Sequence, residues 1–313
     1  MNDLMQTLLP LMAAAEAAVP LPVPASRVQQ RDRINRVTDH LGAQGVEPGP
    51  EVASVVDHSV PVAGGVIDVR VYSSGSGEPR PLYVYLHGGS FWQGSAVSFV
   101  VDALCRERSA LGFVVASVEY RLAPEHRFPG PVEDCHAALA WLVAEHARLG
   151  IDPDRVVIGG ASAGGNLAAA VTLLARTRGP RLMAQLLEVP ALDLTGGHLV
   201  DTGNGMALGD AAMREVRELY LAEPGQESDE LASPLLAADL TGLPPALVMV
   251  AEHDELRGDG EAYARRLGEH GVKAELRCVS GHVHVSPQFT ALLESARVWR
   301  GVVHEWLTRV AAG

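Results

Sequence analysis

The sequence predicts an α/β fold with a mostly parallel central sheet. Short apolar runs rich in Val and Leu recur along the chain, as in strands buried on both faces, and segments of helical length separate them. This alternation is typical of crossover units that join parallel strands. The predicted strands are Val66–Tyr72, Leu82–Leu86, Phe113–Val118, Val156–Ile158, Leu186–Val189, Ala246–Val250 and Lys273–Val279. The predicted helices are Val97–Leu111, Val132–Leu149, Asn166–Arg176, Asp259–His270 and Phe289–Val310.

An N-terminal appendage precedes this pattern. Met1–Leu9 and Leu11–Val19 predict two short helical pieces, broken or kinked at Pro10 because proline lacks the N–H that the helix ladder needs. A polar helix is expected over Ser26–Leu41.

The core, residues 49–313, contains one irregular region. Thr195–Gly209 is rich in glycine, and Asp210–Ala222 has a helical pattern. We expect a cap insertion at about residues 195–224, on the side where the strands end. Together with N-terminal cap helices over residues 1–48 it would form a lid.

Composition narrows the class of protein. The net charge of −13 argues against a nucleic-acid partner and against docking on an anionic membrane, because phosphates would be repelled. Cys105, Cys135 and Cys278 are far apart, odd in number and without a CxxC motif, which indicates buried reduced thiols and a reducing cytoplasm.

The apolar stretch Leu8–Val23 has only a superficial likeness to a signal peptide. Asp3 but no Lys or Arg precedes it, and Glu16 interrupts it, whereas a secretory signal has a basic start and an uninterrupted apolar middle. No other segment approaches the roughly 20 apolar residues of a membrane-spanning helix. We therefore expect an unexported, cytoplasmic protein.

Residues 160–164, Gly-Ala-Ser-Ala-Gly, match the pattern G-x-S-x-G between the strand Val156–Ile158 and a helix that opens near Asn166. A sharp strand-to-helix turn with small neighbours strains the backbone of such a serine and exposes its hydroxyl beside a helix N-terminus. The pentapeptide alone occurs by chance in a chain with 32 glycines, and an ordinary tight turn is the alternative. In this context it predicts a nucleophile at Ser162.

Residues 87–90, His-Gly-Gly-Ser, directly follow the strand Leu82–Leu86. Acyl transfer creates an oxyanion that needs backbone N–H donors already in place, and glycines let the main chain approach closely. A simple glycine turn is the alternative, but two such motifs at the ends of two strands favour an oxyanion loop. His87 is expected to hold this loop by hydrogen bonds.

The acid and the base of a serine hydrolase are expected after the serine in the order Ser, Asp, His. Asp254 follows the strand Ala246–Val250, where a carboxylate can orient an imidazole and stabilise its charged form. Glu252 and Glu255 are rivals, and a solvated acidic loop is the alternative for all three.

Two histidines, His282 and His284, follow the last strand in the sequence Gly-His-Val-His. In an extended chain both would point to the same side, so alternation does not choose between them. A His-x-His pair also raises a metal site. No further ligand cluster with suitable spacing accompanies the pair, so no metal is expected.

Several segments occur in one characteristic order: residues 87–92 (HGGSFW), 120–126 (YRLAPEH), 128–129 (FP), 132–135 (VEDC), 160–166 (GASAGGN), 233–235 (SPL), 242–245 (GLPP), and Asp254 with Leu256-Arg257. With these segments the chain resembles the bacterial hormone-sensitive-lipase-like carboxylesterases, from about its first predicted strand to its C-terminus. The resemblance implies an α/β-hydrolase fold with a helical cap.

The same resemblance implies the site and the activity. Ser162 matches the family's nucleophile, Asp254 its acid, and His284 its base in the pattern G-x-x-H, with His282 nearer the rim. The implied oxyanion donors are the backbone amides of Gly89, Ser90 and Ala163, in a loop that Gly88 shapes. The family hydrolyses small-molecule esters with short acyl groups such as acetyl, without cofactor or metal. Many members pair into dimers, so a homodimer is an expectation.

Four positions depart from the family pattern. Ala161 replaces an acidic residue, so a supporting hydrogen bond is missing, and Ser90 replaces a glycine, which keeps the N–H but narrows the available conformations. Glu188 stands where apolar or aromatic residues are usual, and it is a candidate to face the pocket. Val285 and Ser286 replace a Gly-Phe pair after the base.

Three alternative functions stay open. An amidase, or an N- or O-deacetylase of a specialised metabolite, would use the same triad, and the motifs do not separate it from an esterase. A non-catalytic receptor for a small ligand is another reading, against which the complete set of triad residues counts. The third is metal binding through His282 and His284.

Overall fold

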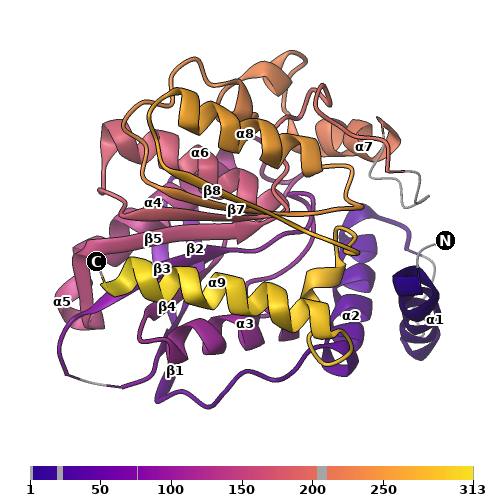
Figure 1. Cartoon of the computed structure of the whole chain (residues 1–313), viewed down its shortest axis with the longest axis horizontal. Coiled ribbons are helices and arrows are strands. Elements are labelled where there is room, and N and C mark those ends of the chain that lie inside the picture. The colour runs from indigo at the N-terminus through magenta and orange to yellow at the C-terminus, as the bar shows by residue number, and fades with distance from the viewer. Residues whose placement is uncertain (1–2, 20–23, 76, 203–209, 313) are drawn as a thin grey trace.

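The computed structural model describes residues 3–19, 24–75, 77–202 and 210–312. Within them, one eight-stranded sheet runs through the middle of the molecule (Figure 1). Its strands are β1 (Ser54–Val62), β2 (Gly65–Ser73), β3 (Arg80–Leu86), β4 (Val114–Glu119), β5 (Ile151–Ala161), β6 (Ala184–Glu188), β7 (Ala246–Ala251) and β8 (Ala274–Val279). They lie in the order β1-β2-β4-β3-β5-β6-β7-β8. The pairs β1–β2 and β2–β4 are antiparallel and the other five pairs are parallel, which confirms the predicted fold class.

Helices cover both faces of this sheet (Figure 1). α3 (Phe99–Ala110) and α9 (Glu294–Ala312) pack on one face, and α4 (Gly130–Ala144), α6 (Ala163–Arg178) and α8 (Arg257–Glu269) pack on the other. The remaining α-helices of the described residues are α1 (Asp3–Ala18), α2 (Arg27–Gly45), α5 (His146–Leu149) and α7 (Asp210–Tyr220). Short 3₁₀ turns occupy Gln226–Ser228, Pro234–Leu236 and Ser286–Gln288.

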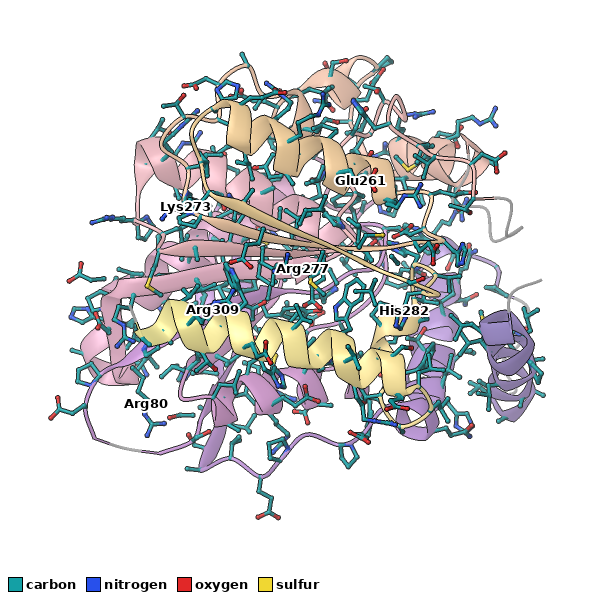
Figure 2. The ribbon with its side chains drawn as sticks, viewed as in Figure 1. Arg80, Glu261, Lys273, Arg277, His282 and Arg309 are labelled. Atoms are coloured by element: carbon teal, nitrogen blue, oxygen red, sulfur yellow. The ribbon has the colours of Figure 1, made fainter. Side chains whose placement is uncertain are left out.

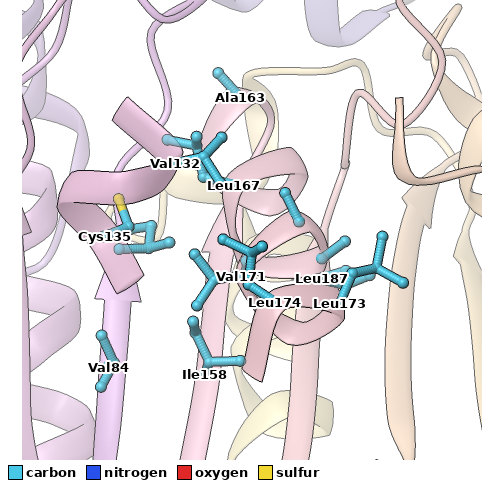
Figure 3. Packing of buried hydrophobic residues seen from close by; sticks show 14 of the residues in the cluster. Val84, Val132, Cys135, Ile158, Ala163, Leu167, Val171, Leu173, Leu174 and Leu187 are labelled. Carbon is cyan, nitrogen blue, oxygen red and sulfur yellow. The ribbon is translucent and has the colours of Figure 1, made fainter. Parts of the chain in front are cut away.

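The α6 face holds the larger part of the core. Leu167, Val171 and Leu174 of α6 pack in one buried cluster with Ile158 of β5 and Leu187 of β6 (Figure 3). Each fully buried aliphatic side chain contributes about 1.5–3 kcal/mol relative to its exposed state. The helix that follows the G-x-S-x-G motif is therefore fixed against the sheet by apolar packing along its length.

Each predicted strand overlaps an observed strand, but the sequence pattern does not predict β1. This strand lies at the edge of the sheet and pairs only with β2, and Val60 is its one buried residue. It therefore has no continuous apolar run, and it contains Pro61, which edge strands tolerate.

The helix boundaries differ from the expectations in three places. α1 runs through Pro10 as one helix, so the predicted break is wrong: Leu8 and Ala15, on either side of the proline, are both buried in a cluster with Leu41 and Phe289. The helix predicted over Val132–Leu149 is divided between α4 and α5. The last helix begins at Glu294, after a 3₁₀ turn. Among the described residues no helix is long and apolar enough to cross a membrane.

Candidate active site

Ser162 lies at the sharp turn between β5 and α6. Its backbone angles, φ 57° and ψ −119°, belong to a region that residues other than glycine rarely adopt. The turn is possible because its neighbours are small: a Cβ on Gly164 would come 2.0 Å from the carbonyl oxygen of Leu86. The Ser162 side chain is therefore presented at the N-terminus of α6, as the motif predicts.

A line of hydrogen bonds joins Ser162, His284 and Asp254. The Ser162 Oγ lies 2.9 Å from His284 Nε2, and His284 Nδ1 lies 2.8 Å from Asp254 Oδ2. The Asp254 side chain is 1% exposed and that of His284 14% exposed. The second carboxylate oxygen of Asp254 accepts the N–H of Leu256 at 3.0 Å, which fixes the carboxylate.

This environment changes the pKa of His284. Burial lowers it, but attraction to the Asp254 carboxylate and the hydrogen bond with it outweigh burial, so the net pKa is raised. The carboxylate therefore stabilises the imidazolium form of His284.

The two rival carboxylates lie elsewhere. Glu252 accepts the Gly281 N–H at 2.8 Å and a hydrogen bond from Ser280 Oγ, and so ties the end of β7 to the loop after β8. The buried carboxylate that contacts the imidazole is that of Asp254, whereas Glu252 and Glu255 are partly exposed. The choice of Asp254 over Glu252 and Glu255 depends on the directions of side chains in one loop, which sequence spacing alone does not give.

The two histidines of the loop after β8 diverge. His284 contacts Ser162 and Asp254, whereas His282 is 0% exposed and its Nδ1 lies 2.7 Å from Ser286 Oγ. The loop is not extended, so the two rings do not share a side. The expectation that His282 lies near the rim is wrong: it is buried beside Trp299, with ring centroids 5.8 Å apart.

The loop after β3 lies beside Ser162 and has an unusual backbone conformation. Gly89, Ser90 and Phe91 have φ values of 130°, 53° and 65°. The Gly89 carbonyl accepts the N–H groups of Trp92 and Gln93, which folds the loop back on itself. Within the described residues, the amides of Gly89, Ser90 and Ala163 donate to no protein acceptor. These are the three N–H groups that the sequence predicts as oxyanion donors, and no protein acceptor among the described residues occupies them.

The His87 side chain packs against Tyr120 and supports this loop. Its ring stacks on Tyr120 with centroids 4.3 Å apart, its Nδ1 lies 2.8 Å from the Gly88 carbonyl oxygen, and Tyr120 Oη donates to the His87 carbonyl at 2.7 Å. Burial lowers the pKa of His87, which favours the neutral ring. Gly88 passes close to the nucleophile turn, where a Cβ would come 2.9 Å from the Ala161 carbonyl oxygen.

A cavity of about 220 Å³ opens over Ser162. Helix α2 contributes Gln30 and Ile34 to its lining, and α7 contributes Met213 and Glu215. The predicted cap regions therefore both reach the cavity, although helical patterns in the sequence do not indicate which of their residues do so.

Two further expectations are corrected. Glu188 does not face the cavity: it alternates with Leu187, whose side chain lies in the α6 cluster, and points to the α9 face of the sheet, where Arg108 and Trp299 contact it. Cys278, on the edge strand β8, is exposed, whereas the other two thiols are buried. Among the described residues no group of three or more His, Cys, Asp or Glu side chains is placed to hold a metal ion.

Comparison with known proteins matches residues 83–288 to a family model described as "alpha/beta hydrolase fold". The chain is 40% identical to the carboxylic ester hydrolase LipN of Mycobacterium tuberculosis over 76% of its own length and 65% of LipN. It is 36% identical to an arylesterase of Saccharolobus solfataricus over 87% of this chain and 88% of that protein. Its structure is similar to that of EstE1, a thermostable carboxylesterase from a metagenomic library, with TM-score 0.85 and 36% identity over 93% and 99% of the two chains.

The chain belongs to this α/β-hydrolase family. Together with these relatives it lies in the hormone-sensitive-lipase-like group of carboxylic ester hydrolases, which confirms the resemblance stated from the motifs.

The opposite surroundings of the two histidines predict opposite titrations. Asp254 raises the pKa of His284 and burial lowers that of His282, so His284 should titrate above the ordinary histidine value of about 6.5 and His282 below it. Side-chain NMR of the two imidazoles against pH measures both. Asp254→Asn should move the His284 midpoint down and leave His282 in place. A His284 midpoint that Asp254→Asn does not move would contradict the assigned cause.

Proposed function

We propose that this chain is a serine carboxylesterase that hydrolyses short-chain acyl esters through an acyl-enzyme. The observation that carries the proposal is the unbroken Ser162–His284–Asp254 line, with distances of 2.9 and 2.8 Å, whose Ser162 end lines the cavity. A hydroxyl that lines the cavity and hydrogen-bonds to an imidazole, beside free backbone amides, is suited to attack on a carbonyl carbon.

In the first half-reaction the Ser162 oxygen attacks the ester carbonyl carbon while His284 Nε2 takes the hydroxyl proton. The carbonyl π electrons move to oxygen, and the resulting oxyanion accepts hydrogen bonds from the Gly89, Ser90 and Ala163 amides. Asp254 stabilises the imidazolium without accepting its proton. Collapse of the intermediate breaks the bond to the leaving alcohol, which takes the proton from His284.

Water completes the cycle by the same route. His284 removes a proton from the water while the water oxygen attacks the acyl carbon. The second tetrahedral intermediate then releases the Ser162 oxygen, which takes the proton back from His284. The steps require only groups of this chain, the ester and water. Since His284 must be neutral to accept a proton, kcat/KM falls as pH falls through its raised pKa.

Replacement of the nucleophile is the direct test. Ser162→Ala should lower kcat by roughly 10⁴–10⁶-fold, because the triad residues act as a unit. The substitution removes one half-buried hydroxyl that lines the cavity, so the thermal midpoint should stay close to that of the unchanged protein. The measurements are kcat for hydrolysis of p-nitrophenyl acetate and covalent labelling by a fluorophosphonate. Substantial hydrolysis by the purified variant would refute the proposal.

Two substitutions test the oxyanion loop: one adds a side chain at a glycine, and the other replaces a side chain by glycine. At Gly89, φ is 130° and a Cβ would come 2.0 Å from the Gln93 carbonyl oxygen, so Gly89→Val should displace the loop. Loss of one oxyanion donor typically costs about 10²–10³ in kcat. Ser90→Gly keeps the N–H and relieves a positive φ, so its kcat should stay near normal. Near-normal turnover by a folded Gly89→Val variant would mean that this loop does not stabilise the oxyanion.

The size of the cavity supports short acyl groups. At about 220 Å³ it is smaller than the roughly 300–1,000 Å³ typical of drug-sized ligand pockets. The helices α2 and α7, which we propose to be parts of one cap over the core, close its upper side.

We therefore expect kcat/KM for p-nitrophenyl esters to be highest between acetyl and about hexanoyl and to fall for longer chains, because the extra methylenes stay outside the cavity. A panel from acetate to palmitate measures this. Comparison of a matched acetate ester and acetanilide on the same aryl group separates an esterase from an amidase. A maximum at palmitate would contradict the proposed acyl range, and faster anilide cleavage would favour the amidase.

A further inference from the structure

A charged pair is buried on the face of the sheet that α3 and α9 cover. Arg108 of α3 is 0% exposed, and Glu188, the last residue of β6, is 6% exposed. Arg108 Nη2 donates to Glu188 Oε1, and Arg108 Nη1 donates to Tyr83 Oη at 2.5 Å. Attraction between buried charges does not reliably offset the cost of removing them from water, so such a pair is weak evidence for stability. Its position indicates another role.

The Glu188 carboxylate is held on both oxygens. Trp299 Nε1 of α9 donates to Oε2 at 2.8 Å, while Arg108 binds Oε1. Burial raises the pKa of Glu188, but attraction to Arg108 and Arg300 and the Trp299 hydrogen bond outweigh burial, so the net pKa is lowered. Glu188 is therefore an ionised, fully partnered anchor inside the protein at neutral pH.

The backbone of this anchor touches the nucleophile turn. The Glu188 carbonyl accepts the N–H of Ser162 at 2.9 Å, and the Ser162 carbonyl accepts the N–H of Ala191 at 3.3 Å. Two unfavourable conformations meet here, since Val189 has φ 41° and Ser162 has φ 57°. Conformations of this kind persist only where the surrounding structure fixes them firmly. The side-chain anchor at Glu188 supplies such a constraint directly beside both residues.

The same anchor reaches the loop that carries the base. The Trp299 ring meets the His282 ring edge to face, with centroids 5.8 Å apart and planes at 66°. Figure 2 shows His282 beside the first half of α9. His282 is two residues before His284 and is itself fixed by Ser286. Trp299 thus contacts both the residue behind the nucleophile and the segment that positions the imidazole.

We propose that Glu188, held by Arg108 and Trp299, is a positioning residue for Ser162, and that Trp299 extends this constraint to His284 through His282. The inference rests on the proposed roles of Ser162 and His284. It assigns a function to the acidic residue that the sequence places, unexpectedly, in a buried strand. The constraint acts on the distance and angle between hydroxyl and imidazole, so its loss should slow the chemical step more than it weakens substrate binding.

The test compares double variants that remove the charges together. In Arg108→Met with Glu188→Leu, the anchor is replaced by apolar side chains of similar size. No unpaired charge is left, so the thermal midpoint should fall only modestly, through the lost partners of Trp299 Nε1 and Tyr83 Oη. We expect kcat for p-nitrophenyl butyrate to fall by roughly 10- to 100-fold with KM nearly unchanged. Arg108→Met with Glu188→Gln keeps an acceptor for Trp299 Nε1 and should recover much of the lost kcat.

A matched control lies one residue away. Glu107 on the same helix pairs with Arg300 of α9 at 2.9 Å, and within the part of the chain that the structure describes it has no hydrogen bond or ion pair with residues 160–164. Glu107→Gln should leave kcat unchanged, even where it lowers the thermal midpoint. This control separates loss of an α3–α9 ion pair as such from loss of the anchor behind Ser162.

The outcomes are distinct. A folded Arg108→Met, Glu188→Leu variant (the Leu form) with unchanged kcat overturns the positioning role. Equal kcat in the Leu form and in the Arg108→Met, Glu188→Gln variant (the Gln form) also overturns it. If the Leu form does not fold, Trp299→Phe decides, because it keeps an aromatic ring at this position and removes the Nε1–H donor together with the five-membered ring of the indole: reduced kcat supports the inference, and unchanged kcat overturns it. Full activity of Ser162→Ala would instead refute the proposed function itself.

Discussion

The site depends on close contact between main-chain segments at the ends of β3 and β5. A Cβ on Gly164 would lie 2.0 Å from the Leu86 carbonyl oxygen, and one on Gly88 would lie 2.9 Å from that of Ala161. Because these positions have no side chain, the start of α6 fits against the end of β3. The same contact brings the loop after β3, with its free amides, beside Ser162. The nucleophile turn and the oxyanion loop are thus one packing unit.

The imidazole reaches this unit from the far half of the chain. His284 lies 122 positions after Ser162, and the parallel register of β5, β6, β7 and β8 brings their ends to one edge of the sheet. The loops after β7 and β8 are then joined by the His253 N–H, which donates to the His282 carbonyl at 2.9 Å. Sheet register therefore provides the coarse placement, and short loop contacts such as this one provide the final hydrogen-bond distances.

The sequence predicts the parts of this arrangement that depend on local pattern. Apolar runs locate the strands, and G-x-S-x-G between a strand and a helix locates Ser162. It does not predict β1, because an edge strand buries too little to have an apolar run. It also misplaces His282 and Glu188, because the surroundings of both depend on Trp299, more than a hundred positions from Glu188 along the chain. Contacts between residues this far apart in the sequence follow from the packing of helices on the sheet and produce no local pattern in the sequence.

The two helices that line the cavity, α2 and α7, are held by different contacts. Arg31 of α2 donates to the carbonyls of Trp92 and Ala123, both at 2.6 Å, so α2 is tied to the oxyanion loop. The contact between α2 and α7 through Arg27 and Glu215 is instead an ion pair with both side chains more than 40% exposed, and such pairs contribute little to stability. α7 is instead held by apolar packing: Met213 and Tyr220 are buried in the main core cluster, and the Tyr220 ring stacks on Phe91 with centroids 3.9 Å apart. Both helices that line the cavity are therefore fixed to the core by contacts other than the exposed ion pair between them.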